Sequence, residues 1–248
     1  MPHEFEVRHE VTINATPEAV WKAISEGPGI DSWFMGHTEL EPREGGRGSH
    51  TFPGEAPSGS TVTAWEPGKH LAYRGDLNED GTFMAFEYLI EGRESGSTVL
   101  RFVHSGFLGG DWEAEHDALK VGDLQYLLKL TAYVEHFPSR LSTHNMFLFK
   151  PQVPAERAWP ALATALGLDG EIRQGDKVTI AIEGLVPQDG VVDWVARPGE
   201  FVGVRTDDGL YMFVHAQDNV VVEHHAYTDI DGEAFERAWQ SWLDTALV

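Results

Sequence analysis

The chain has 248 residues, of which 42% are hydrophobic, and its 18 basic and 40 acidic side chains give a formal net charge of −22. This length allows one large domain or two ordinary ones, and the absence of cysteine excludes disulfides and thiolate metal sites. So acidic a surface repels phosphate backbones and anionic lipid headgroups, and we expect neither nucleic acid nor membranes as partners. The sequence has no apolar run of about 18 residues and no signal-peptide pattern at its start, so we expect a cytoplasmic protein.

The first segment of the chain alternates between apolar and charged side chains. In HEFEVRHEVTI, residues 3–13, this alternation has the period of a half-buried strand. The next stretch, NATPEAVWKAISEG, predicts a short helix with Thr16 as its N-cap, Pro17 as its first residue and Gly27 as its stop signal.

A stretch rich in Gly, Pro and charge follows, GIDSWFMGHTELEPREGG at residues 29–46, and we expect no regular element there. Turn residues then separate several short apolar runs, which predicts an antiparallel meander. From Trp112 to Phe137 apolar residues recur every three or four positions, so we predict a long amphipathic helix that ends before Pro138. The expected strands of the meander are Ser49–Phe52, Ser60–Glu66, His70–Arg74, Phe83–Glu91 and Thr98–His104.

The second half of the chain repeats the pattern of the first. FLFKPQVPAERAWPALATALG, residues 147–167, matches residues 5–27 in its strand, its Pro and Trp and its final Gly. VVDWVARPGEFVGVR, residues 191–205, matches residues 61–74 in a Trp shortly before Pro-Gly and in a closing Arg. Residues 231–248 occupy the position of the long helix. Three matched segments in the same order indicate a tandem duplication.

The first half also resembles a known family in its short motifs. These are TPEAVWKAISEG, the Trp-Phe pair after it, VTAWEPGKHLAYR, HSGF at residues 104–107 and a glycine, Gly122, inside the last helix. In this order they resemble the homologues of the heat-shock-protein-90 ATPase activator, which belong to the START-like helix-grip superfamily known as SRPBCC. Where that family usually has Gly-Trp in the final helix, this chain has Gly122 followed by Asp123.

The resemblance implies an α+β fold of two helix-grip domains, residues 1–140 and 141–248, each an antiparallel sheet curved around a C-terminal helix. The second domain is expected to be shorter and degenerate. The resemblance also implies a cavity between the first sheet and its long helix, with Trp33 and Phe34 lining or closing the mouth, or else plugging one end of the core. Aromatic and polar side chains on the inner faces of the strands suit a binding cavity, or equally a filled core. The expected ligand-binding residues are Trp33, Phe34, Trp65, Tyr73, Met84, Phe86, Tyr88, Phe102, His104, Phe107 and Tyr126.

Catalytic and metal chemistry find less support in the sequence. His104 continues the apolar face of its strand, but no carboxylate stands beside it to orient a general base. Glu87 should point to the opposite face and Asp111 should cap the long helix, so we expect no catalytic residue. The histidines of that helix and of residues 224–225 lack the spacing of metal ligands, and no phosphate loop or dinucleotide motif occurs. We therefore expect neither a metal nor a cofactor.

Three classes of function remain. We favour a protein that binds a hydrophobic or aromatic small molecule in the cavity of the first domain, with the second domain as a structural partner. The alternatives are a cyclase-type or hydrolase-type enzyme that uses the same cavity, and a protein-interaction role such as stimulation of a chaperone ATPase. The sequence leaves open whether the protein also forms a homodimer.

Overall fold

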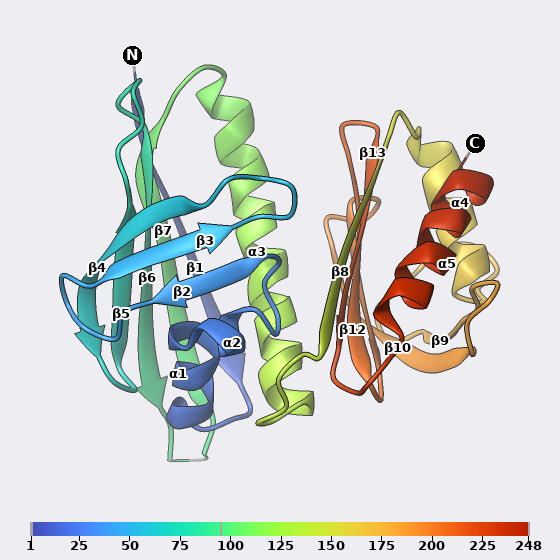
Figure 1. Cartoon of the computed structure of the whole chain (residues 1–248), viewed down its shortest axis with the longest axis horizontal. Helices are drawn as coiled ribbons and strands as arrows, with labels where there is room; N and C mark the ends of the chain where they lie inside the picture. Colours follow the sequence, from blue (N-terminus) through green and yellow to red (C-terminus); the bar gives the residue numbers. More distant parts are fainter. Residues whose placement is uncertain (1, 95, 248) are drawn as a thin grey trace. The chain divides into compact units, whose positions relative to one another are not determined.

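The computed structural model describes residues 2–94 and 96–247. The chain divides into two compact units, Met1–Leu141 and Ser142–Val248. Each unit begins with a strand and a short helical segment, continues through antiparallel strands and ends in a helix, as Figure 1 shows. None of the helices in this described part is both long and apolar enough to cross a membrane.

In the described part of the first unit, the strands form a seven-stranded antiparallel sheet with the order β1-β7-β6-β5-β4-β3-β2. The first strand therefore pairs with the last, and the others follow in reverse chain order. The strands are β1 His3–Ile13, β2 His37–Leu40, β3 Arg47–Thr51, β4 Ser58–Glu66, β5 His70–Gly75, β6 Phe83–Gly92 and β7 Thr98–Leu108. The helices are α1 Pro17–Ser25, α2 Gly27–Ile30 and α3 Trp112–His136. Helix α3 packs along β1 and β7, which places it on the inner face of the sheet.

Local signals in the sequence explain where the helices of this unit begin. The Thr16 hydroxyl accepts a hydrogen bond from the Ala19 N–H at 3.3 Å, and Pro17 takes the first helical position, so the predicted start of α1 is confirmed. The long helix also begins at Trp112, as predicted. Asp111 stands at its N-cap position, but the side chain makes no capping hydrogen bond, so its expected capping role is not present.

Residues 29–46 contain more regular structure than the sequence suggested. Helix α2 extends to Ile30, and β2, His37–Leu40, pairs along its whole length with β3. The expectation of a stretch without regular elements was therefore wrong. The reason is that β2 is an edge strand held by its backbone hydrogen bonds to β3, and such a strand needs no run of apolar side chains.

The second unit repeats this topology with one strand fewer. The described residues of this unit form a sheet of six strands in the order β8-β13-β12-β11-β10-β9, so again the first strand pairs with the last. The strands are β8 His144–Pro151, β9 Lys177–Ile180, β10 Gln188–Ala196, β11 Phe201–Thr206, β12 Gly209–Ala216 and β13 Asn219–Ala226. The helices are α4 Ala155–Ala165 and α5 Gly232–Ala246. Helix α5 has 15 residues and α3 has 25, so the second unit is the shorter version of one design.

Candidate functional site

A large cavity lies in the first unit, between the inner face of the sheet and α3. Its volume is about 570 Å³, within the range of small-molecule sites in proteins. The walls come from α1, α2, the segment after α2, strands β2 to β7 and α3. Aromatic residues among the lining are Trp33, Phe34, Phe52, Tyr73, Phe83, Phe86, Tyr88, Phe102 and Tyr126.

The Trp-Phe pair after α2 is folded inward and contributes to this lining. The Trp33 side chain is buried, and its Nε1–H donates a hydrogen bond to the Ala23 carbonyl oxygen at 2.8 Å. The Phe34 ring lies edge-on to the Tyr126 ring of α3, with the ring centroids 4.6 Å apart. This contact joins the segment after α2 to the long helix across the cavity wall.

The sheet supplies a continuous row of rings from three neighbouring strands. Tyr73 on β5 and Phe86 on β6 have ring centroids 5.2 Å apart, and Phe86 stacks on His104 of β7 at 4.3 Å. Tyr88 and Phe102 form a second such pair at 5.0 Å. Their spacing follows from the strand register, because side chains on one face of antiparallel strands meet directly opposite one another. The expected site residues found in the cavity lining are Trp33, Phe34, Tyr73, Met84, Phe86, Tyr88, Phe102, His104 and Tyr126.

Two of the expected site residues, Trp65 and Phe107, do not belong to the cavity lining. Trp65 packs edge-on against Trp21 of α1, at a centroid distance of 5.1 Å, and does not line the cavity. Phe107 follows His104 by an odd number of positions, so strand alternation points it to the opposite face of the sheet. It is absent from the cavity lining, although its ring contacts that of Phe83, which belongs to the lining. Both expectations are therefore corrected. Phe107 was expected in the site because it belongs to the HSGF motif, but strand alternation determines which face its side chain occupies.

His104 has the carboxylate partner that the sequence did not reveal. Its Nδ1 lies 3.1 Å from Oδ1 and 3.0 Å from Oδ2 of Asp123 on α3. The two side chains are only 3% and 12% exposed, and no hydrogen-bond partner within the described ranges reaches His104 Nε2. As expected, Glu87 does not contact His104, and it pairs instead with His70 at 2.8 Å. Asp123 stands where the resembling family usually has Trp, and that departure was the only signal of its role.

Two tyrosine hydroxyls form the other polar feature of the chamber. Tyr73 and Tyr88 are neighbours on the sheet, with ring centroids 6.4 Å apart. Burial raises the pKa of Tyr73 to about 12, and it raises the pKa of Tyr88 well above its ordinary value. The negative charge of Asp123 adds to both increases in pKa. Both hydroxyls therefore remain protonated at physiological pH.

The fully charged side chains of the lining all have the same sign. They are the carboxylates of Glu39, Asp76, Glu115 and Asp123, and neither Lys nor Arg occurs in the lining that the structure describes. Asp76 pairs at 2.7 Å with Arg47, which is itself not part of the lining. Burial lowers the pKa of His50, also in the lining, which favours its neutral form. Within residues 2–94 and 96–247, no three His, Asp or Glu side chains are placed to hold a metal ion.

Comparison with known proteins agrees with this geometry. Residues 4–120 match the family model described as polyketide cyclase / dehydrase and lipid transport. The chain is a tandem of two helix-grip domains. No curated protein matches it closely enough to count as a relative.

Several solved structures are similar to the chain. A crystal structure of a Mesorhizobium loti protein is 25% identical over 52% of this chain and 96% of its own, with a TM-score of 0.47. The Aha1 dimer from Colwellia psychrerythraea is 21% identical over 53% of this chain and 96% of its own, with a TM-score of 0.44. The di-domain ARO/CYC BexL is 13% identical over 98% of this chain and 96% of its own, with a TM-score of 0.49.

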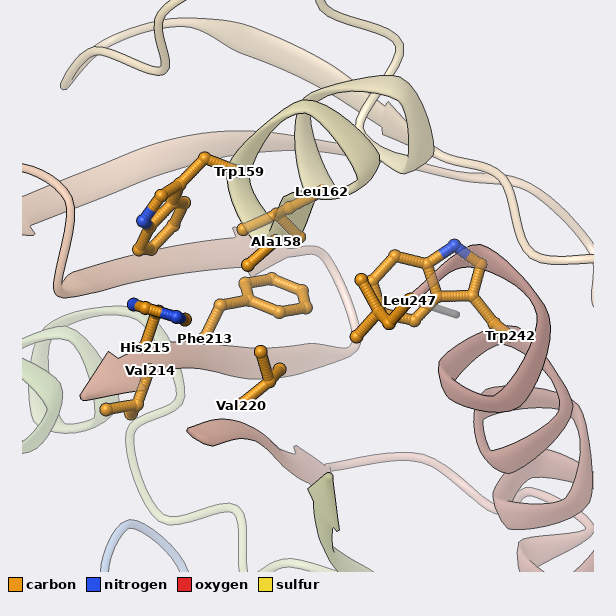
Figure 2. Close-up of a pocket in the computed structure, with 9 residues that line it drawn as sticks. All are labelled: Ala158, Trp159, Leu162, Phe213, Val214, His215, Val220, Trp242 and Leu247. Atoms are coloured by element: carbon orange, nitrogen blue, oxygen red, sulfur yellow. The ribbon is translucent and has the colours of Figure 1, made fainter. Parts of the chain in front are cut away.

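A pocket described in the second helix-grip domain is much smaller than the cavity of the first. This pocket has a volume of about 10 Å³, close to the minimum for one water molecule, and side chains from α4, β12, β13 and α5 line it (Figure 2). Trp239 of α5 is completely buried and packs against Tyr211 and Phe213, with both pairs of ring centroids 5.8 Å apart. Large aromatic side chains thus fill the position that is hollow in the first domain.

Proposed function

We propose that the first helix-grip domain binds a largely apolar, aromatic small molecule between its sheet and α3. The observation that carries this proposal is the 570 Å³ cavity with its rows of aromatic rings. A family model whose description includes lipid transport, matched over residues 4–120, also supports it. The second domain, with its filled core, then serves as a structural partner.

The lining explains how such a guest gains affinity. Transfer of apolar surface from water contributes about 25 cal/mol per Å², and each well-placed aromatic pair adds roughly 0.5–1.5 kcal/mol. A rigid, flat guest also loses little conformational entropy when it binds. We expect dissociation constants in the micromolar range, which corresponds to about −8 kcal/mol.

Ligand titration with a cavity-filling variant tests this proposal. The full chain is titrated with a fluorescent tricyclic aromatic compound while tryptophan fluorescence is followed, and native mass spectrometry reports the stoichiometry. A Cβ added at Gly122 meets no atom within 4 Å, so Gly122→Leu places its side chain in open space on the cavity side of α3. We expect one molecule to bind to the wild type and binding to be lost in this variant. Equal affinity of the two proteins would refute the cavity as the site.

The His104–Asp123 pair favours a second candidate function, an enzyme of the cyclase or dehydrase kind. A general base needs an orienting partner, and the Asp123 carboxylate supplies one at 3.0 Å. The description of the matching family includes both reaction types. Multiple turnovers of a polyketide-like substrate by the wild type, absent in His104→Gln, would establish this activity. A chaperone-related role and a homodimer stay predictions.

A further inference from the structure

The charges around the cavity restrict what the guest can be. The lining that the structure describes contains four carboxylates and neither Lys nor Arg. A bound carboxylate or phosphate would therefore leave water without meeting a cationic side chain of the lining, which is costly in an apolar chamber. The buried Lys129 ammonium lies 5.7 Å from the Tyr126 ring centroid but does not belong to the lining. The formal net charge of −22 acts in the same direction, because it repels anions and attracts cations before they reach the mouth.

Asp123 is the carboxylate placed deepest among the aromatic rings. Its side chain is 12% exposed, whereas that of Asp76 is 54% exposed and already pairs with Arg47. A carboxylate can accept about four hydrogen bonds, and the Nδ1–H of His104 supplies one donor shared between its two oxygens. The carboxylate of Asp123, which lines the cavity, can therefore accept further hydrogen bonds from a ligand.

The rings around Asp123 suit a cation as well. The faces of aromatic rings carry negative potential, and ammonium groups bind over them, most strongly where water is excluded. The negative charge of Asp123 acts on Tyr73 and Tyr88, whose neutral hydroxyls add dipoles to the chamber without adding charge. Phe86 lies between Tyr73 and His104 and completes this wall.

We propose that the guest of the first domain is an aromatic amine, whose protonated nitrogen pairs with Asp123 while its rings fill the chamber. This inference rests on the proposed function and adds the charge of the ligand to it. The guest needs a flat apolar body of two or more rings and an ammonium group on a short arm. Neutral analogues bind through the rings alone, and anionic analogues meet repulsion from Asp123.

Three probes of the same shape test the proposal on the full chain: anthracenylmethylamine, anthracenylmethanol and anthracene carboxylate. Their affinities are measured by quenching of tryptophan fluorescence and by calorimetry. We expect the ammonium probe to bind at least about tenfold more tightly than the alcohol, and the carboxylate to bind most weakly. We also expect most of this preference to persist at high salt, because a buried pair is screened less than a surface pair.

Two variants assign the preference to one side chain. Asp123→Asn removes the charge but keeps the size, and it should reduce the affinity for the ammonium probe to that for the alcohol. Glu113→Gln on the same helix changes the net charge equally but lies outside the lining and exposed, so it should leave the preference intact. Retained binding of the alcohol by Asp123→Asn shows that this variant is folded.

The outcomes separate this inference from the function on which it rests. Equal binding of the alcohol and the ammonium probe, or tighter binding of the carboxylate, would overturn the amine proposal and leave the cavity function standing. A preference that survives in Asp123→Asn would also overturn it. Failure of all three probes to bind to the wild type would instead count against the cavity function itself.

Discussion

The indole Nε1–H of Trp33 is bonded to the carbonyl oxygen of Ala23 at 2.8 Å, which ties the segment after α2 to the first helix. The Phe34 N–H donates to the Ile30 carbonyl at 2.8 Å and continues the hydrogen bonding of α2. Trp33 is 4% exposed and still belongs to the cavity lining. The Trp-Phe pair is therefore a fixed part of the wall, and Trp33 serves both the core and the cavity.

Replacement of Trp33 should affect stability and binding together. We expect Trp33→Ala to lower the free energy of unfolding of the first domain by about 3–5 kcal/mol, as for other large aromatic side chains removed from a core. Ligand affinity should fall in the same variant because part of the wall is lost. Chemical denaturation and ligand titration measure the two effects. Trp33→Phe, which loses the hydrogen bond but keeps a ring, should cost only about 1 kcal/mol, and an unchanged stability of Trp33→Ala would contradict this role.

The fold was predictable wherever the sequence carries local signals. The alternation of residues 3–13, the Thr16–Pro17 start of α1 and the apolar period of α3 each specify one element and its ends. The residues of strand β2 carry no such signal, because its extended structure is held by hydrogen bonds to β3. An edge strand of this kind depends on its neighbour and cannot be found from its own residues.

The candidate site was predictable along strands but not between elements. Alternation correctly placed Phe86 and His104 on the inner face, since neighbouring residues on a strand point to opposite sides. The same rule, applied to Phe107, would have excluded it. Asp123 was missed because its contact with His104 joins a helix to a strand 19 residues away, and only the assembled fold brings them together.

Gly122 offers a test of the cavity that does not threaten the fold. A glycine in a helix interior costs about 1 kcal/mol relative to alanine, and a Cβ at this position meets no atom within 4 Å. We expect Gly122→Ala to raise the free energy of unfolding by about 1 kcal/mol and to keep ligand binding. Gly122→Leu should keep this gain and lose binding. Thermal denaturation and titration distinguish the two variants, and a loss of stability in Gly122→Ala would show that the glycine has a packing role.

Alkaline pH should destabilise the first domain through its buried tyrosines. The pKa of Tyr73 is raised from 10.0 to about 12, so above pH 10 the unfolded chain ionises while the folded domain keeps the proton. The stabilisation is complete below pH 10 and declines as the pH rises through the window up to about 12, by about 1.4 kcal/mol per pH unit for one tyrosine. Denaturation at a series of pH values, with tyrosinate absorbance as the reporter, measures this decline. Tyr73→Phe should make it less steep, and an equal slope in this variant would assign the effect to other groups.

The His104–Asp123 pair should behave as a coupled unit in a double-mutant cycle. The His104 side chain is buried and that of Asp123 is only 12% exposed, so removal of one leaves the other without its partner. We expect His104→Phe or Asp123→Leu alone to cost about 1–3 kcal/mol. In the double variant no orphaned polar group remains, so its stability should lie closer to the wild type than the sum of the single losses. Amide hydrogen exchange of β7 and α3 reports on the first domain separately from the second. Strictly additive losses would mean that the 3.0 Å contact contributes nothing to the stability of the fold.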